Sequence, residues 1–138
     1  MRTISAGAIV FRRTKGGLEF LLLQHELGHG EFPKGKIEDG EEEKETVRRE
    51  IEEETSIKRV SFVEGFRKTL KYSYRRKGRG IFKTVIYYLA ETRQKSVRIS
   101  SEHRGFAWLS FEDASRTLTY KNSRNVLTKA MVSLRKIK

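Results

Sequence analysis

Short runs of apolar, β-branched and aromatic residues recur along the chain between polar segments, and they predict β-strands. Residues 18–24 (LEFLLLQ) are almost continuously apolar, so we expect this strand to be buried on both faces. Other segments rich in β-branched and aromatic residues predict strands at 5–13, 60–66, 69–74, 81–91 and 105–110. Residues 75–80 predict a hairpin turn, and residues 25–36 predict a loop.

Three segments instead repeat their apolar residues every three or four positions, as amphipathic helices do. They cover residues 42–55, 111–118 and 122–137. The expected buried stripes are Val47 and Ile51 in the first and Val126, Ala130 and Leu134 in the last. Many strands with few helices predict a mixed-sheet α/β sandwich, and a length of 138 residues predicts one domain over residues 1–138.

Composition limits where the chain acts and what it binds. No run of eighteen apolar residues occurs, so we expect a cytoplasmic protein without a membrane-spanning segment. The absence of cysteine excludes disulfides and thiolate ligands, which leaves oxygen and imidazole to bind any metal. The sequence gives no indication of oligomeric state.

Charge is unevenly distributed along the chain. The formal net charge is +12, yet ten of the eighteen acidic residues lie between residues 38 and 54. Because a helix advances 100° per residue, Glu50, Glu53 and Glu54 fall on one side of the predicted helix. Carboxylates this close repel one another unless a cation lies among them, and hard oxygen ligands select Mg²⁺, Mn²⁺ or Ca²⁺.

The alternative for a glutamate-rich helix is a solvated face in which Lys44 and Arg48 pair with neighbouring glutamates. The spacing of the acidic residues favours the metal site. It runs Gly35, five residues, Glu41, seven residues, Arg49-Glu50, an aliphatic, one residue, Glu53-Glu54, one residue, Ser56 and an aliphatic. This pattern resembles the signature of the Nudix hydrolases, in which a glycine stands where this chain has Ser56.

The Nudix resemblance implies an α/β/α sandwich with a mixed sheet, in which the loop, helix and loop of the signature hold metal and pyrophosphate. It implies that Mg²⁺, or Mn²⁺ in its place, is bound by Glu50, Glu53, Glu54 and the carbonyl of Gly35. Arg49 and Glu41 are implied to brace the helix by ion pairing, and Arg49, Glu53 and Glu54 are the expected catalytic residues. If the glycine of the signature has positive φ, Ser56 carries strain of about 1 kcal/mol.

Further segments resemble the diadenosine tetraphosphate hydrolases within this family, up to about residue 121. They are SAGAIVFRR, EFLLLQ, FPKGKIEDGE, VEGFRKTLKY, KTVIYYLAE and SEHRGFAWLS. This resemblance implies a nucleotide substrate, with Lys83 on phosphate and Tyr72 stacked on adenine. It also implies Glu102 near the metals, as a further catalytic residue. We therefore expect hydrolysis of diadenosine tetraphosphate to ATP and AMP.

Basic and aromatic residues outside the signature are the candidates for substrate binding. Residues 67–83 carry eight Lys or Arg and no acidic residue, which suits a polyphosphate, although a solvated hairpin has the same composition. Lys34 is a further candidate because it lies beside the predicted metal loop. His25 and His29 are candidates for phosphate contact, with idle loop histidines as the alternative.

Two other functions stay open. The chain has Phe32 and a single Pro33 where the diadenosine tetraphosphate hydrolases often have a tryptophan and paired prolines, and related hydrolases of RNA 5′ ends and of diphosphoinositol phosphates have similar openings. The net charge of +12 and the basic hairpin favour a pyrophosphohydrolase of RNA 5′ ends. A Nudix-fold module that senses a nucleotide without turnover is the third reading, and an incomplete set of signature glutamates would mark it.

Overall fold

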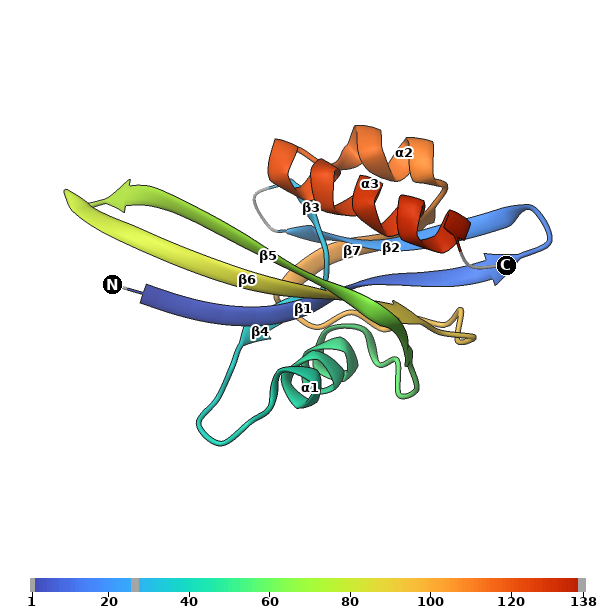
Figure 1. Ribbon diagram of the computed structural model, residues 1–138, viewed down its shortest axis with the longest axis horizontal. Coiled ribbons are helices and arrows are strands. Elements are labelled where there is room, and N and C mark those ends of the chain that lie inside the picture. Colours follow the sequence, from blue (N-terminus) through green and yellow to red (C-terminus); the bar gives the residue numbers. More distant parts are fainter. Residues whose placement is uncertain (1, 26–27, 137–138) are drawn as a thin grey trace.

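The computed structural model describes residues 2–25 and 28–136 and places a seven-stranded sheet between two helical layers (Figure 1). The strands are β1 (Arg2–Thr14), β2 (Gly17–His25), β3 (Gly30–Glu31), β4 (Lys34–Lys36), β5 (Ser61–Arg76), β6 (Arg79–Glu91) and β7 (His103–Leu109). The helices are α1 (Glu43–Thr55), α2 (Phe111–Thr117) and α3 (Lys121–Lys136). Helix α1 covers one face of the sheet and α2 and α3 cover the other, so the expected α/β/α sandwich is confirmed.

The sheet is mixed because β1 runs parallel to β6 and antiparallel to its other neighbours. Its main order is β3-β2-β1-β6-β5, with β4 paired to β1 and β7 paired to β2. Since β6 takes one edge of β1, strands β2 and β4 share the other edge, β2 near residues 11–14 and β4 near residues 5–7. The chain therefore leaves β2 and returns to β1 as β4 directly before α1, and β7 lies on the far side of β2.

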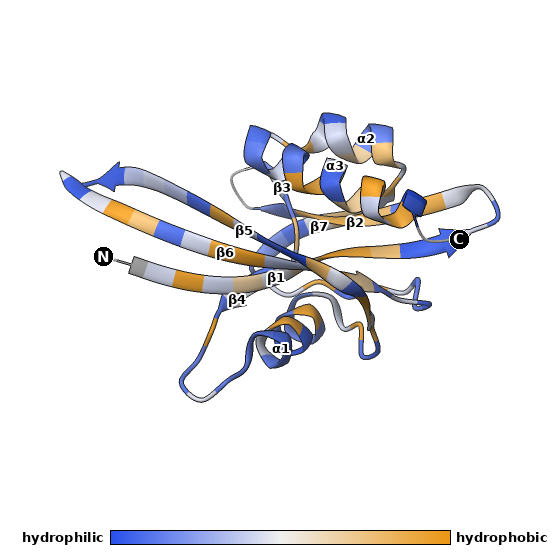
Figure 2. Ribbon diagram, in the orientation of Figure 1, coloured by the Kyte–Doolittle hydropathy of each residue, from blue (hydrophilic) through white to orange (hydrophobic). Residues whose placement is uncertain are grey.

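Apolar side chains fill the space between the sheet and each helical layer, and Figure 2 shows hydrophobic colours along the central parts of β1, β2 and β6. The predicted helix stripes are confirmed: Val47 and Ile51 pack in the core under α1, and the three stripe residues of α3 pack in the core on the opposite face. Leu21 packs toward α1 whereas Leu22 packs toward α3. Strand β2 is therefore buried on both faces, as its apolar run predicts.

Two predictions about the strands are wrong. Residues 61–66 and 69–74 belong to one strand, β5, which passes an irregularity between Phe62 and Arg67 where Gly65 has φ +86°. The predicted loop 25–36 contains the short strands β3 and β4, which the sequence does not announce because they depend on pairing with β2 and β1. Residues 26–27 of that loop and residue 137 of the last predicted helix lie outside the described residues.

Ser56 ends α1 in the left-handed conformation, with φ 65° and ψ 12°, where the Nudix signature has glycine. Its backbone N–H donates to the carbonyl of Glu52 at 2.8 Å, and its hydroxyl donates to the carbonyl of Arg98 at 3.1 Å. The strain expected for a non-glycine residue is therefore present, and the hydroxyl bond offsets part of it.

We expect Ser56→Gly to leave the free energy of unfolding near its original value, because lost strain and the lost hydroxyl bond nearly cancel. Ser56→Ala keeps the strain and loses the bond, so it should destabilise the protein by about 1 kcal/mol. Urea denaturation of the three proteins measures both changes. An alanine variant as stable as the glycine variant would contradict the strain at this position.

Among the described residues, none of the helices is long and apolar enough to cross a membrane. The cytoplasmic location stays a prediction from the sequence.

Candidate active site

Helix α1 carries Glu50, Glu53 and Glu54, the three glutamates predicted to bind metal. Hydrogen bonds near its first turn connect it to the sheet. The carboxylate of Glu43 accepts hydrogen bonds from Nε and Nη2 of Arg67, both at 2.9 Å, and from the hydroxyl of Tyr88 at 2.6 Å. These bonds, that from Arg67 first, lower the pKa of Glu43 to about 2. A carboxylate near the helix N-terminus also suits the helix dipole. The helix is thus held in one position relative to β5 and β6.

Arg49 connects the glutamates of the site to one another. Its Nε and Nη2 donate to the carboxylate of Glu41 at 2.6 and 3.0 Å, so the expected ion pair is present and bidentate. Its Nη1 lies 2.5 Å from Glu50 and 3.3 Å from Glu53, and Nη2 also donates to the carbonyl of Lys36 at 3.1 Å. Arg49 therefore contacts two of the three carboxylates predicted to bind metal, Glu50 and Glu53, in addition to Glu41.

Strand β4 brings its backbone against the same glutamates. The backbone N–H of Lys34 donates to Oε2 of Glu54 at 3.2 Å. A Cβ atom on Gly35 would overlap the carboxylate of Glu50, so only glycine allows strand and carboxylate to approach this closely. Pairing of Gly35 with Ala6 in β1 fixes the strand at this point. The backbone of Lys34 and Gly35 therefore lies directly against the carboxylates of Glu54 and Glu50.

The three carboxylates differ sharply in exposure. The side chain of Glu53 is 58% exposed, that of Glu50 is 14% exposed and that of Glu54 is only 6% exposed. Burial raises the pKa of Glu54 to about 9, and its hydrogen bond to Glu50 and the charge of Glu50 add to the increase. Crowded, partly buried carboxylates beside a glycine backbone match the oxygen ligands that a hard divalent cation requires. The residues present therefore fit such a cation.

The raised pKa of Glu54 predicts how stability depends on pH without metal. The folded protein keeps this proton up to about pH 9 whereas the unfolded chain releases it near pH 4.5, so stability should fall as pH rises through that interval. We expect Glu54→Gln to raise the melting temperature at pH 8 in EDTA by several degrees. This corresponds to an increase of about 1 to 2 kcal/mol in the free energy of unfolding. Thermal scans at pH 5 and pH 8 test this.

The matched control is Glu52→Gln, an exposed change on the same helix that should leave the pH profile unaltered. Mg²⁺ should stabilise the original protein more than Glu54→Gln, because the cation binds only the folded carboxylate form. Identical pH profiles of the original and Glu54→Gln proteins in EDTA would contradict this account.

A cavity of about 530 Å³ opens beside Glu54, a volume in the range of small-molecule sites. It is lined by His25, Glu31, Lys34, Glu54, Ser101, Glu102 and His103. Three further residues predicted from the sequence, Lys34, Glu102 and His25, thus meet Glu54 at one cavity. The ring of His29 stacks on that of His25, with their centres 4.4 Å apart.

Three residues of the cavity, Glu31, Ser101 and His103, were not predicted from the sequence. Nε2 of His103 lies 2.9 Å from Glu31 and 3.6 Å from Glu54, while its buried Nδ1 has no hydrogen-bond partner among the described residues. Because a proton on Nδ1 would stay unsatisfied, we assign the proton to Nε2, which donates to Glu31. The sequence carried no local signal for this contact, since it arises from the pairing of β2 with both β3 and β7.

Tyr72 and Lys83 face each other across β5 and β6. Partial burial raises the pKa of Tyr72, the charge of Lys83 lowers it, and the charge of Glu31 raises it. Tyr72 is therefore within electrostatic range of the cavity. Nζ of Lys83 lies 5.7 Å from the ring centre of Tyr74. The hairpin thus presents aromatic rings beside a lysine on one face, as its sequence suggests.

Known proteins resemble this chain in sequence and in fold. Residues 1–130 match the NUDIX domain family. The chain is 39% identical over 135 residues to the bis(5′-nucleosyl)-tetraphosphatase [asymmetrical] of Mus musculus, covering 89% of each chain. A structure of the C. elegans Ap4A hydrolase binary complex superposes with a TM-score of 0.86 at 32% identity, covering 98% of this chain and 99% of that chain. The E. coli dihydroneopterin triphosphate pyrophosphohydrolase, 16% identical with a TM-score of 0.76, covers 91% and 92% and shares the fold.

Proposed function

The chain belongs to the Nudix family, and we propose on that basis that it is a pyrophosphohydrolase that cleaves a phosphoanhydride bond in dinucleoside polyphosphates. The proposed substrate is diadenosine tetraphosphate, with ATP and AMP as products. One observation carries this choice: the set of signature glutamates is complete in a chain that resembles asymmetrical tetraphosphatases over about nine-tenths of its length. We also propose that residues 1–138 act as one unit, because both cores share a single sheet.

A divalent cation belongs to this proposal, with Mg²⁺ as the ion and Mn²⁺ as its substitute. The residues that would hold it are Glu50, Glu53, Glu54 and the carbonyl of Gly35. Such a cation, when bound, neutralises phosphate charge and lowers the pKa of water. The crowding of these carboxylates and the raised pKa of Glu54 support this assignment.

The chain's own residues orient the reacting groups and move the proton. Arg49 keeps Glu50 and Glu53 in position through the bonds to its guanidinium. We propose that a carboxylate of the site takes the proton of the attacking water, with Glu53, Glu54 and Glu102 as the candidate bases. Glu54 is supported by its burial, which raises the proton affinity of its carboxylate.

Lys34, Lys83 and Tyr72 are the proposed substrate contacts outside α1. The two lysines would bind phosphates, and Tyr72 would stack on an adenine ring. Lys34 lines the cavity beside Glu54, whereas Lys83 and Tyr72 lie on the β5–β6 hairpin, so contacts in both places would fix how the polyphosphate lies. A fixed register determines which phosphorus is attacked, and therefore which products form.

The products of diadenosine tetraphosphate in ¹⁸O-labelled water test this proposal. Asymmetrical attack gives ATP and AMP, and the heavy oxygen enters only one of them. Two molecules of ADP would mean symmetrical cleavage and would rule out the proposed register. Triphosphorylated RNA should be offered in parallel, because a strong preference for RNA would replace the dinucleotide assignment.

Lys83→Ala should raise KM for diadenosine tetraphosphate about tenfold or more, since a charge-assisted bond to phosphate contributes about 1 to 3 kcal/mol. The KM for a short diphosphate-linked nucleotide that does not reach Lys83 should rise much less. The matched control is Lys71→Ala, because Lys71 lies on the same hairpin with its side chain on the opposite face. Steady-state kinetics on both substrates measure the difference, and equal losses would make Lys83 a structural residue.

The second candidate function is hydrolysis of RNA 5′ ends, and the basic hairpin favours it. Residues 71–80 are all exposed, and they include five Lys or Arg without an acidic residue. Such a surface attracts a nucleic-acid backbone with an affinity that falls steeply as salt rises. A nucleotide-sensing module without turnover is disfavoured because Glu50, Glu53 and Glu54 are all present.

A further inference from the structure

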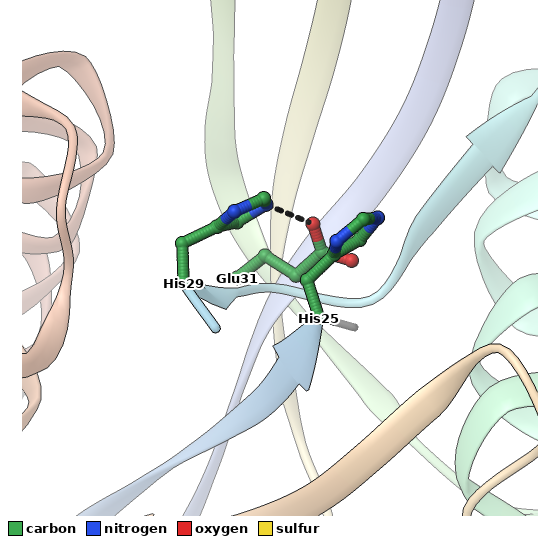
Figure 3. A group of neighbouring side chains, drawn as sticks. All are labelled: His25, His29 and Glu31. Carbon is green, nitrogen blue, oxygen red and sulfur yellow. Dashed lines mark ion pairs between the residues drawn. The ribbon is translucent and has the colours of Figure 1, made fainter. Parts of the chain in front are cut away.

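A second cluster of metal-binding side chains lies apart from the α1 glutamates, at the junction of β2 and β3 (Figure 3). One ligand atom from each of His25, His29 and Glu31 lies within 4.8 Å of the other two. Nε2 of His29 is 3.4 Å from Oε1 of Glu31, and the two imidazole rings are stacked. We propose that these three residues bind a divalent transition metal of the zinc class, which goes beyond the proposed function and does not depend on it.

The pairing of β2 with β3 brings the three side chains to one face. Gln24 is paired with Gly30, and the backbone N–H of His25 donates to the carbonyl of His29 at 2.9 Å, so these two residues lie opposite each other. Side chains two residues apart on a strand point the same way, which puts Glu31 on the face of His29. The positions of the three residues are therefore set by the pairing of the two strands, and their proximity is not a chance contact of surface side chains.

Neighbouring residues hold two of the three ligands in place. His103 lies 2.9 Å from Oε2 of Glu31, which leaves Oε1 on the side of His29. The ring of Tyr120 packs edge-on against His29, with the ring centres 5.5 Å apart. Carboxylates that bind metals are commonly oriented by such second hydrogen bonds. His103 thus supplies such a second hydrogen bond to Glu31, and Tyr120 packs against the ring of His29.

The ligand types select the class of metal. Two imidazoles and one carboxylate suit Zn²⁺ and its transition-metal neighbours, whereas Mg²⁺ prefers oxygen ligands alone. Since the three ligand atoms lie at most 4.8 Å apart, a cation among them would be at most about 2.8 Å from each, so the side chains need to close by at most about 0.7 Å to reach bonding distance. The side chains of His29 and Glu31 are about one-fifth exposed, which leaves room for this adjustment and for entry of the ion.

The position of the cluster connects it to the cavity. His25 and Glu31 line the same cavity as Glu54, and His103 lies between Glu31 and Glu54. A transition metal bound here would add positive charge to a wall that carries Glu31, Glu54 and Glu102 against the single Lys34. The two sites are nevertheless separable by chemistry, because excess Mg²⁺ competes for the oxygen-only ligands of α1 and leaves the imidazoles available.

Calorimetric titration of the tag-free, metal-stripped protein with Zn²⁺ in millimolar Mg²⁺ tests the site. We expect one equivalent of Zn²⁺ to bind, and His25→Ala and His29→Ala each to weaken it by about 100-fold or more. The matched control is Glu53→Gln, which changes the α1 site and should bind Zn²⁺ like the original protein. No Zn²⁺ bound under these conditions, unchanged binding in both histidine variants, or loss in Glu53→Gln would each overturn the proposal.

Nuclear magnetic resonance tests the proposed site on the original protein, so the result does not depend on whether a variant folds. The chain has only three histidines, so their ring signals can be followed separately. Substoichiometric Zn²⁺ in excess Mg²⁺ should shift the rings of His25 and His29 together, and Co²⁺ should produce the visible absorption of a site with nitrogen ligands. Ring signals of both residues that stay unchanged up to one equivalent of Zn²⁺ would overturn the proposal.

Discussion

Replacing either Glu53 or Glu54 by glutamine should lower kcat by about two orders of magnitude or more. Each substitution removes a charged oxygen from the proposed metal ligands and a candidate base, and either loss alone accounts for an effect of this size. Both carboxylates lie on the side of α1 that also carries Glu50; Glu54 accepts a hydrogen bond from the backbone of β4, and Glu53 contacts Arg49. Turnover of diadenosine tetraphosphate at saturating Mg²⁺ measures the change, and excess chelator should abolish it in the original protein.

Misfolding can be separated from lost chemistry in this experiment. Glu54→Gln should be more stable than the original protein in EDTA, so an inactive variant with a higher melting temperature has lost function while keeping its fold. Glu52→Gln, at the exposed position directly before the two tested residues, should keep full turnover and serves as the matched control. Full turnover of both Glu53→Gln and Glu54→Gln in the presence of chelator would contradict the metal assignment.

The features of the fold that depend on local sequence are the ones that the sequence predicts best. The spacing from Gly35 to Ser56 placed the helix and its glutamates, because helical periodicity alone decides which side chains share a face. The position at which the chain departs from the signature also predicted local structure. Ser56 adopts the left-handed conformation for which glycine is usually required. The apolar run of residues 18–24 identified a strand buried on both faces, because consecutive apolar residues place apolar side chains on both sides of a strand.

Contacts between distant strands could not be predicted in this way. His103 meets Glu31 only because β2 pairs with β3 on one edge and with β7 on the other, and no single segment records that arrangement. Strands β3 and β4 have two and three residues, too few to produce a periodic pattern. In β5, the polar pair Arg67 and Lys68 interrupts the apolar pattern of a strand that is continuous, because one of its faces is exposed to solvent there.

Gly7 illustrates how pairing gives meaning to a residue that looks unremarkable in the sequence. A Cβ atom at Gly7 would overlap the carbonyl oxygen of Pro33 and the side chain of Lys34, so β1 can accept β4 only where it lacks a side chain. Gly7 lies between Ala6 and Ala8, both fully buried. Small residues at this point of β1 therefore allow β4 to reach α1 and to bring Gly35 to the glutamates.

Gly35→Ala should be the most damaging change in the site that leaves every charged residue in place. The added methyl group would overlap the carboxylate of Glu50, so either that carboxylate or β4 has to move. A shift of Glu50 also disturbs its contact with Arg49, which at the same time holds Glu53. Misplacement of a catalytic group by about 1 Å can cost about 100-fold in rate, so we expect kcat to fall by about that factor or more.

The dependence of turnover on Mg²⁺ distinguishes this local effect from general destabilisation. Gly35→Ala should require a higher Mg²⁺ concentration for half-maximal rate, because its carbonyl and Glu50 are both proposed ligands of the cation. The matched control is Gly16→Ala in the β1–β2 turn, where the nearest atom to a new Cβ is the hydroxyl oxygen of Thr14 at 3.9 Å, so kcat and the Mg²⁺ dependence should both be kept. If Gly35→Ala behaved like this control, the close approach of β4 to Glu50 would have no part in catalysis, and the proposed metal ligation by the Gly35 carbonyl would have to be abandoned.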